Sequence, residues 1–244
     1  MSDGLDRREQ IQRGLDLTEE RISAACHAAG RDRGDVHLIV VTKTWPVEDL
    51  RVLAELGVRE VGENKAGDLA DKRQQLAGAH LTWHFIGQLQ SNKARLVAQH
   101  ADVVQSIDRP KLIAVLSRER VGAREEMGWE GSRPLECLVQ VSLDGEPTIG
   151  RGGATPTLAR ELADQIAGSP GLRLRGVMGV APLEGSARGA FERLRDVADL
   201  IRADHPDAIW ISAGMSGDLE EAVAEGATHL RVGSAILGSR SILR

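Results

Sequence analysis

A lysine that follows a buried strand pattern is the residue in this sequence best placed for covalent chemistry. Residues 38–41 form an uninterrupted aliphatic run, the pattern of a strand buried on both faces of a parallel sheet, and Lys43 follows between Thr42 and Thr44. In α/β folds, ligands bind where such strands end. We expect the Lys43 amine to lose hydration there and to attack a carbonyl. The alternative is a lysine whose ammonium group stays in water.

Two later loops combine glycine with small hydroxyl residues and predict an anion site. They are SAGMS, residues 212–216, and GSA, residues 233–235, and each lies between a strand pattern and a helix start. Backbone N–H groups in such turns point at one spot and attract a phosphate. The alternative is that the glycines permit tight turns and the serines cap helices.

Three further polar residues have a functional and a structural interpretation. Arg231 lies in the last strand pattern, on the same side as Gly233, and its partner is either an acid such as Asp218 or a ligand atom. Asn64 either contacts a ligand hydroxyl or caps the helix that follows it. His84, in an apolar strand pattern, is more typical of a hydrogen-bonded core group than of a catalytic base.

Strand and helix patterns alternate along the whole chain and position these residues. A long helix is predicted over residues 3–29. Strand patterns follow at 37–41, 60–62, 82–86, 103–105, 135–141, 174–178, 209–211 and 229–232. Helix patterns lie between them at 46–56, 64–76, 92–100, 110–120, after 155, 190–201 and 218–225, with a last one from 235. The stretches 121–134 and 144–155 are predicted to be mobile surface loops.

Eight strand–helix units predict a single (β/α)8 barrel domain over residues 1–244, with an extra N-terminal helix. Strict alternation implies parallel strands and right-handed crossovers, and the length of 244 residues is typical of such a barrel. The alternative is an open, doubly wound sheet. In a barrel, Lys43, Asn64 and the two glycine- and serine-containing loops lie at the end where the strands stop.

Composition and charge exclude several classes of partner. The formal net charge of −5 argues against a nucleic-acid backbone, and no apolar run reaches the ~20 residues that span a bilayer. The charged N-terminus does not resemble a signal peptide. The two cysteines, Cys26 and Cys137, are far apart and outside any metal or redox motif, so we expect free buried thiols in a cytoplasmic protein.

An amine nucleophile and a phosphate cradle in one barrel mouth predict a ligand that is both an aldehyde and a phosphate ester. Pyridoxal 5′-phosphate (PLP) fits this description. A phosphosugar that forms a Schiff base, as in a barrel aldolase, also fits.

Six stretches of the sequence resemble one family along essentially its whole length. They are VTKT (41–44), VGENK (61–65), WHFIGQLQSNK (83–93), LRGVM (174–178), GMS (214–216) and RVGSAILG (231–238). The family is that of the YggS/PROSC pyridoxal phosphate homeostasis proteins. The resemblance implies a PLP-binding barrel of fold type III, like the N-terminal domain of alanine racemase.

The same resemblance assigns roles to particular residues. It implies that Lys43 holds PLP as a Schiff base and that Arg231 lies near the pyridine nitrogen, where a permanently charged group leaves that nitrogen unprotonated. Ser212, Met215, Gly233 and Ser234 match phosphate-binding positions, and Asn64 matches a residue near the cofactor. Whether Ser212 or Ser216 gives the hydroxyl contact to the phosphate is left open by the sequence.

The sequence favours a PLP carrier over an enzyme. Alanine racemases of this fold type use a tyrosine from another domain as second base, and this chain contains no tyrosine. We therefore expect a monomer that holds PLP for intracellular homeostasis, transfers it transiently to PLP-dependent apo-enzymes, and has little or no turnover. The alternatives are a racemase-like PLP enzyme, with weak racemase-like activity still open, and the phosphosugar aldolase.

Overall fold

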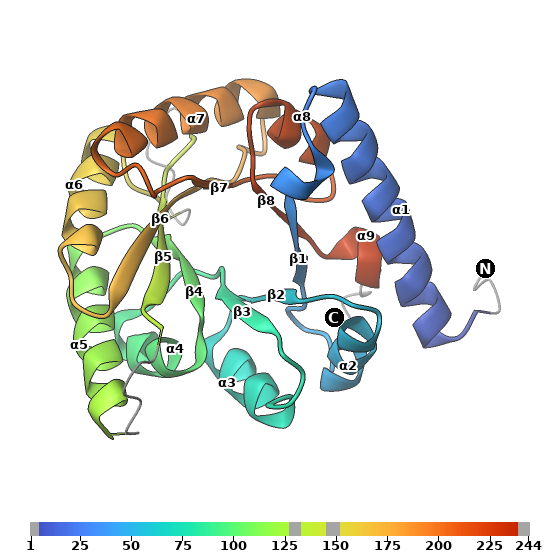
Figure 1. Ribbon diagram of the computed structural model, residues 1–244, viewed down its shortest axis with the longest axis horizontal. Helices are drawn as coiled ribbons and strands as arrows, with labels where there is room; N and C mark the ends of the chain where they lie inside the picture. The colour runs from blue at the N-terminus through green and yellow to red at the C-terminus, as the bar shows by residue number, and fades with distance from the viewer. Residues whose placement is uncertain (1–4, 127–132, 145–151, 239–244) are drawn as a thin grey trace.

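The computed structural model describes residues 5–126, 133–144 and 152–238, and in them parallel strands close into a barrel with helices outside it (Figure 1). The strand order is β1-β2-β3-β4-β5-β6-β7-β8, and β1 pairs with β8. The strands are β1 (His37–Val41), β2 (Glu60–Glu63), β3 (Thr82–Phe85), β4 (Val103–Ile107), β5 (Leu135–Gln140), β6 (Leu172–Met178), β7 (Trp210–Ser212) and β8 (His229–Val232). The predicted (β/α)8 barrel is confirmed.

The helices lie close to their predicted positions. They are α1 (Arg7–Ala28), α2 (Val47–Glu55), α3 (Ala66–Gln75), α4 (Ala94–His100), α5 (Pro110–Glu126), α6 (Pro156–Ala167), α7 (Ala187–Asp204), α8 (Leu219–Ala224) and α9 (Ser234–Leu237), with 3-10 turns at Arg33–Asp35 and Ser91–Lys93. In the part of the chain described, no helix is both long and apolar enough to cross a membrane. Cys26 and Cys137 are free and buried, as predicted.

One predicted loop is partly helical. The stretch 121–134 was predicted to be a loop, but α5 continues to Glu126 because Ala123 packs into the core and prolongs the helix by more than a turn. Residues 127–132 of that stretch, and 145–151 of the predicted loop 144–155, lie outside the described residues. Within 152–155, Ala154 forms an isolated parallel bridge with Val141.

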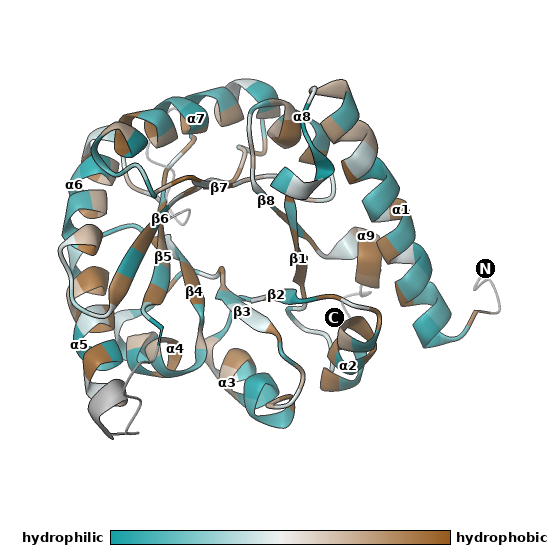
Figure 2. Cartoon of the chain, in the orientation of Figure 1, coloured by the Kyte–Doolittle hydropathy of each residue, from teal (hydrophilic) through white to brown (hydrophobic). Residues whose placement is uncertain are grey.

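The main core fills the space between the strands and the helices. The helices carry apolar residues toward the strands and hydrophilic residues outward (Figure 2). A second, small apolar cluster is formed by Val103 of β4, Leu138 of β5 and Met178 of β6. Polar side chains are buried beside it, and Gln105 of β4 contacts Ser212 of β7. Because β4 and β7 are not neighbours, these two side chains meet across the interior.

The extra helix α1 holds the end of the barrel wall in place. It begins with a capping box between Asp6 and Glu9 and lies along α8 and α9 (Figure 1). Its Arg7 donates to the backbone oxygen of Leu237 at 3.2 Å, and its Arg21 donates to that of Ser216 at 3.0 Å. The helix therefore braces the loop 212–216 and the short helix α9 that follows Gly233.

A glycine lets α1 approach α9 closely, and its replacement by alanine tests this packing. A Cβ atom on Gly14 would lie 2.5 Å from the backbone oxygen of Ile236, whereas a Cβ on Gly67, in α3, would meet nothing within 4 Å. We expect Gly14→Ala to lower the free energy of unfolding by about 1–3 kcal/mol through overpacking. Gly67→Ala is the matched control and should raise it by up to about 1 kcal/mol through helix propensity. Urea unfolding measures both, and equal effects would contradict the close packing.

Candidate functional site

Lys43 lies in a turn directly after β1 and is exposed. The strand ends at Val41, and the turn that follows gives Thr44 a φ of 68°, a conformation that a β-branched residue rarely adopts. The expectation of a poorly hydrated amine is wrong for this structure, because Lys43 stands two residues beyond the last strand residue with its side chain in solvent. Local backbone strain of this kind is concentrated at functional sites.

A buried ion pair between the barrel and α3 anchors the base of this turn. The Lys72 ammonium donates to Glu63 Oε1 at 2.6 Å and to the Thr42 backbone oxygen at 2.9 Å, and the Thr42 hydroxyl donates to the same Glu63 oxygen at 2.6 Å. Burial raises the pKa of Glu63, and the Lys72 and Thr42 contacts oppose that rise. Lys72 was not among the residues predicted from the sequence. It could have been found as a lysine on the core-facing side of a predicted helix.

Asn64 is a candidate ligand contact and does not cap a helix. Helix α3 begins at Ala66, with Lys65 at its N-cap position and no side-chain cap hydrogen bond. The Asn64 Oδ1 atom is buried, and among the described residues it has no hydrogen-bond partner. Asn64 lines a cavity of about 360 Å³ together with Lys65 and Lys93. A buried amide oxygen without a partner is costly, so a ligand donor at this atom would stabilise it.

Arg231 is buried in the barrel and makes its direct contacts with neutral oxygens. Its guanidinium donates to Ser212 Oγ at 2.6 Å and to the Gly179 backbone oxygen at 2.8 Å. Burial lowers the pKa of Arg231 to about 10, which leaves it charged at neutral pH. Asp218, the acid expected as its alternative partner, instead accepts from the Met215 backbone N–H at 2.6 Å.

The two glycine- and serine-containing loops meet, as the sequence predicted. The Ser234 hydroxyl donates to Ser216 Oγ at 3.1 Å, and the Ala235 N–H approaches the same oxygen at 3.4 Å. A Cβ atom on Gly233 would lie 3.0 Å from the Val41 backbone oxygen, so this turn touches the end of the strand that precedes Lys43. The structure thus brings the Lys43 turn and the Gly233 turn onto neighbouring strand ends.

The candidate serines differ in what their hydroxyl groups do. Ser212 is completely buried, and its hydroxyl donates to Gln105 Oε1 at 2.7 Å while accepting from Arg231. Ser216 is half-buried and Ser234 is exposed. Neither serine occupies an N-cap position, since Gly233 caps α9 and Asp218 caps α8. The hydroxyls of Ser216 and Ser234 are therefore the ones accessible from outside the barrel.

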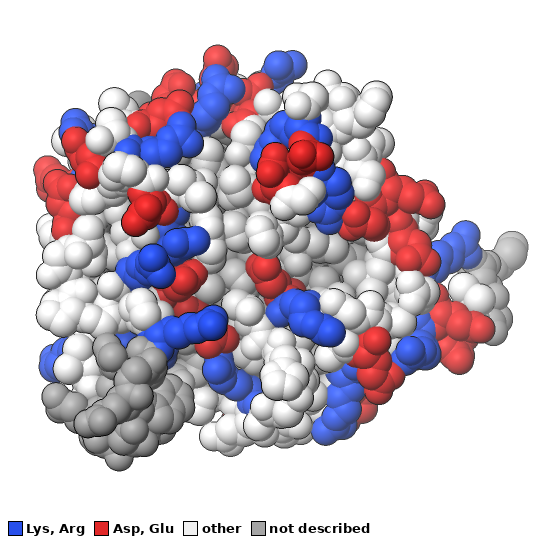
Figure 3. Space-filling view, in the orientation of Figure 1, with Lys and Arg blue, Asp and Glu red and all other residues white. Residues whose placement is uncertain are grey.

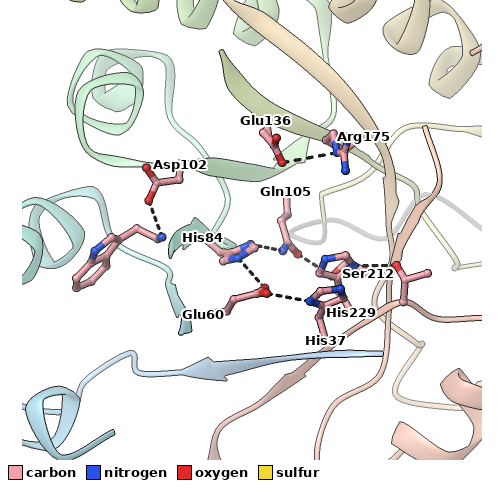
Figure 4. Close-up of polar contacts among 11 residues, drawn as sticks. His37, Glu60, His84, Asp102, Gln105, Glu136, Arg175, Ser212 and His229 are labelled. Atoms are coloured by element: carbon pink, nitrogen blue, oxygen red, sulfur yellow. Dashed lines mark hydrogen bonds and ion pairs between the residues drawn. The ribbon is translucent and has the colours of Figure 1, made fainter. Parts of the chain in front are cut away.

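A cluster of titratable groups occupies the opposite mouth of the barrel, where the strands begin. His37 and His229 stack with ring centroids 4.8 Å apart, and Glu60 Oε1 accepts from His37 Nδ1 at 3.0 Å (Figure 4). The side chain of His84, behind them, is almost fully buried. These residues line a second cavity of about 360 Å³, and charged side chains of both signs surround the hollow at the centre of the face in Figure 3.

This cluster predicts a loss of stability in mild acid. Burial, together with the neighbouring His84, lowers the pKa of His229 to about 3. The unfolded chain therefore binds a proton below about pH 6.5, whereas the folded chain binds it only near pH 3. As the pH is lowered over that interval, the free energy of unfolding decreases by a few kcal/mol. Burial would raise the pKa of Glu60, but the contacts from His37 and His84 outweigh it and lower that pKa. Protonation of Glu60 therefore causes a further loss of folding stability below about pH 4.5. His37, with a raised pKa, acts in the opposite direction but is half-exposed, so its contribution is smaller.

The measurement is urea unfolding between pH 7 and pH 4.5, with a variant that removes the buried ring. His229→Asn retains a polar atom for its partner Thr228 and should flatten the profile. His205→Asn, which removes a histidine paired with Asp164 outside this cavity, is the control. A profile that His229→Asn does not alter would rule out His229 as the main source of acid lability.

Comparison with known proteins places this geometry in a class and then in a family. The family model described as the N-terminal domain of alanine racemase matches residues 18–241, so the barrel is of the alanine racemase N-terminal class. A pyridoxal phosphate homeostasis protein from Mycobacterium leprae is 38% identical over 96% of this chain and 94% of its own. The chain belongs to the family of pyridoxal phosphate homeostasis proteins.

Two solved structures agree with this assignment. An unknown protein from Bifidobacterium adolescentis is 32% identical, with a TM-score of 0.85 over 97% of both chains. PipY from Synechococcus elongatus, in a structure with PLP bound, is 32% identical, with a TM-score of 0.73 over 89% of this chain and 100% of its own.

Proposed function

We propose that this protein binds PLP reversibly and holds it for intracellular homeostasis of the cofactor. The observation that carries the proposal is the adjacency of the exposed Lys43 turn and the Gly233 turn at the ends of β1 and β8. Support also comes from relatives named for PLP homeostasis and from PipY, whose structure has PLP bound. When bound, PLP supplies an aldehyde that condenses with a primary amine with loss of water, and a second amine can reverse the attachment.

The residues present fit this ligand. The unpartnered Asn64 oxygen offers an acceptor, and Gly233 leaves a space that any side chain would fill against Val41. We propose that Lys43 attaches to the aldehyde, that Arg231 faces the ring nitrogen, and that Asn64 lies beside the ring. The phosphate would be held by Ser216, Ser234 and the backbone near Met215 and Gly233. Ser212 would support Arg231 and leave the phosphate to the other serines, because its hydroxyl already donates to Gln105.

The arrangement favours a carrier over a racemase. An exposed Lys43 amine can be reached by an incoming aldehyde and by a second, competing amine, which suits capture and release. Racemisation by two bases needs a second acid–base group opposite the lysine, and the sequence has no tyrosine to supply one. We propose little or no turnover, in a monomeric cytoplasmic protein that passes PLP to apo-enzymes.

The test measures release and turnover with one preparation. PLP-loaded protein is mixed with a PLP-dependent apo-enzyme in the presence of a PLP scavenger, and the enzyme activity that returns is measured. The same measurement is made with free PLP and the scavenger in place of the loaded protein. We expect recovery that resists the scavenger, and no racemisation or decarboxylation of added amino acids. Turnover of an amino acid that Lys43→Ala abolishes would replace the carrier by an enzyme.

A further inference from the structure

Arg231 depends on a neutral hydroxyl group for its position. Among the described residues, no carboxylate forms an ion pair with it, and Ser212 Oγ is its shortest contact, at 2.6 Å. A hydroxyl oxygen can accept from Arg231 only if its own proton points elsewhere. The orientation of the Ser212 proton therefore decides whether the guanidinium keeps this contact in addition to the one with the Gly179 backbone oxygen.

A chain of polar contacts runs from Ser212 across the barrel to the opposite mouth (Figure 4). The Ser212 hydroxyl donates to Gln105 Oε1 at 2.7 Å, and Gln105 Nε2 contacts His84 Nδ1 at 3.0 Å. His84 Nε2 then lies 3.2 Å from Glu60 Oε2, which is an ion-pair distance, although the two atoms are not aligned as a hydrogen bond. Ser212, Gln105 and His84 are at most 1% exposed, so water does not compete for these contacts. Each residue comes from a different strand: β7, β4, β3 and β2.

The chemistry of each group fixes the direction of the whole chain. An ionised Glu60 can only accept, so it draws the His84 proton to Nε2 and leaves a lone pair on Nδ1. That lone pair accepts the Gln105 amide N–H, which turns the Gln105 oxygen toward Ser212. The Ser212 proton then points at Gln105 and its lone pairs face Arg231. Because an amide does not readily pass protons on, the chain transmits orientation and not protons.

We propose that Glu60, His84 and Gln105 are positioning residues that hold Arg231 at the cofactor site from the far mouth of the barrel. This inference rests on the proposed function for the role of Arg231, but the orientation of Arg231 is a property of the protein alone. The consequence is that an acid at the mouth where the strands begin orients a cation buried inside the barrel.

The first experiment needs no ligand. In the cofactor-free protein, the side-chain N–H signal of Arg231 is identified by nitrogen-15 NMR as the signal that Arg231→Lys removes. We expect Glu60→Gln to shift or broaden this signal, because an amide at that position no longer forces the His84 proton toward it. Glu136→Gln is the matched control, since Glu136 lines the same cavity and pairs with Arg175 at 3.6 Å outside the chain. An Arg231 signal that is identical in the wild-type, Glu60→Gln and Glu136→Gln proteins would overturn the proposal.

The second experiment is a double-mutant cycle on PLP affinity. We expect Glu60→Gln to raise the dissociation constant about tenfold, as losses of supporting contacts do, and to shift the absorption maximum of the bound cofactor. In an Arg231→Lys background the same change should have less than about a twofold effect. A loss in thermal stability with unchanged affinity and spectrum, or equal effects in both backgrounds, would reduce Glu60 to a structural role. Wild-type protein that binds no PLP would refute the proposed function, while the NMR result would still decide whether Glu60 orients Arg231.

Discussion

Lys43→Ala is expected to remove the visible absorbance of PLP on this protein and to weaken its binding by about a hundredfold or more. The substitution deletes the only group that we propose to bond covalently to the aldehyde and leaves the proposed phosphate contacts in place. Such contacts would be hydrogen bonds to a charged group, worth about 1.5–3 kcal/mol each, so residual noncovalent binding should persist. Fluorescence titration and the absorption spectrum measure the two effects.

Two neighbouring lysines provide the controls for this prediction. Lys65 and Lys93 line the cavity beside Asn64, and both lie in the stretches that resemble the family. Lys65→Ala and Lys93→Ala should keep the absorbance band and change the affinity less than threefold. If Lys93→Ala or Lys65→Ala lost the band and Lys43→Ala kept it, the assignment of the nucleophile would be wrong.

Lys72→Met is expected to cost about 3–5 kcal/mol of stability, the usual result of leaving one member of a buried ion pair alone. Glu63 has no exposed side-chain surface, and the Lys72 ammonium is its charged partner at 2.6 Å. The loss should be smaller at pH 5 than at pH 8, because the raised pKa of Glu63 lets the isolated carboxyl group become neutral in mild acid. Urea unfolding at the two pH values measures the difference.

The same pair offers a rescue and a link to the site. Lys72→Met combined with Glu63→Leu should recover most of the stability, since an apolar pair of similar volume replaces a buried ion pair well. It should not restore PLP affinity, because Lys72 also holds the Thr42 backbone oxygen below the Lys43 turn. Lys65→Met, at an exposed position, should stay within about 0.5 kcal/mol of wild type. A rescue that restored affinity together with stability would argue against a role for Lys72 in placing the turn.

The sequence predicted the barrel because strand and helix periods are local properties. Residues 38–41 and the later strand patterns carry the aliphatic runs of parallel strands, and their number matches the closed sheet. It also predicted that the loops around Ser216 and Ser234 would meet, since neighbouring strands of a parallel barrel end at the same face.

Contacts between segments that are distant in the chain could not be predicted from the sequence. The exposure of Lys43 depends on where β1 stops, and strand ends are poorly determined by period alone. The pairing of Lys72 with Glu63 joins a helix to a strand, and the contact between Ser212 and Gln105 crosses the barrel. Ser212 looked like a phosphate ligand because its loop contains other small residues, but only its partners show that its hydroxyl is already engaged.

Chemical trapping of the cofactor tests the central claim most directly. The purified protein is incubated with PLP, reduced with borohydride, digested and mapped by mass spectrometry. We predict one dominant pyridoxyl label, on the peptide that contains Lys43, and loss of that label when excess amine is added before reduction. No label, or a label mainly on Lys65 or Lys93, would contradict it.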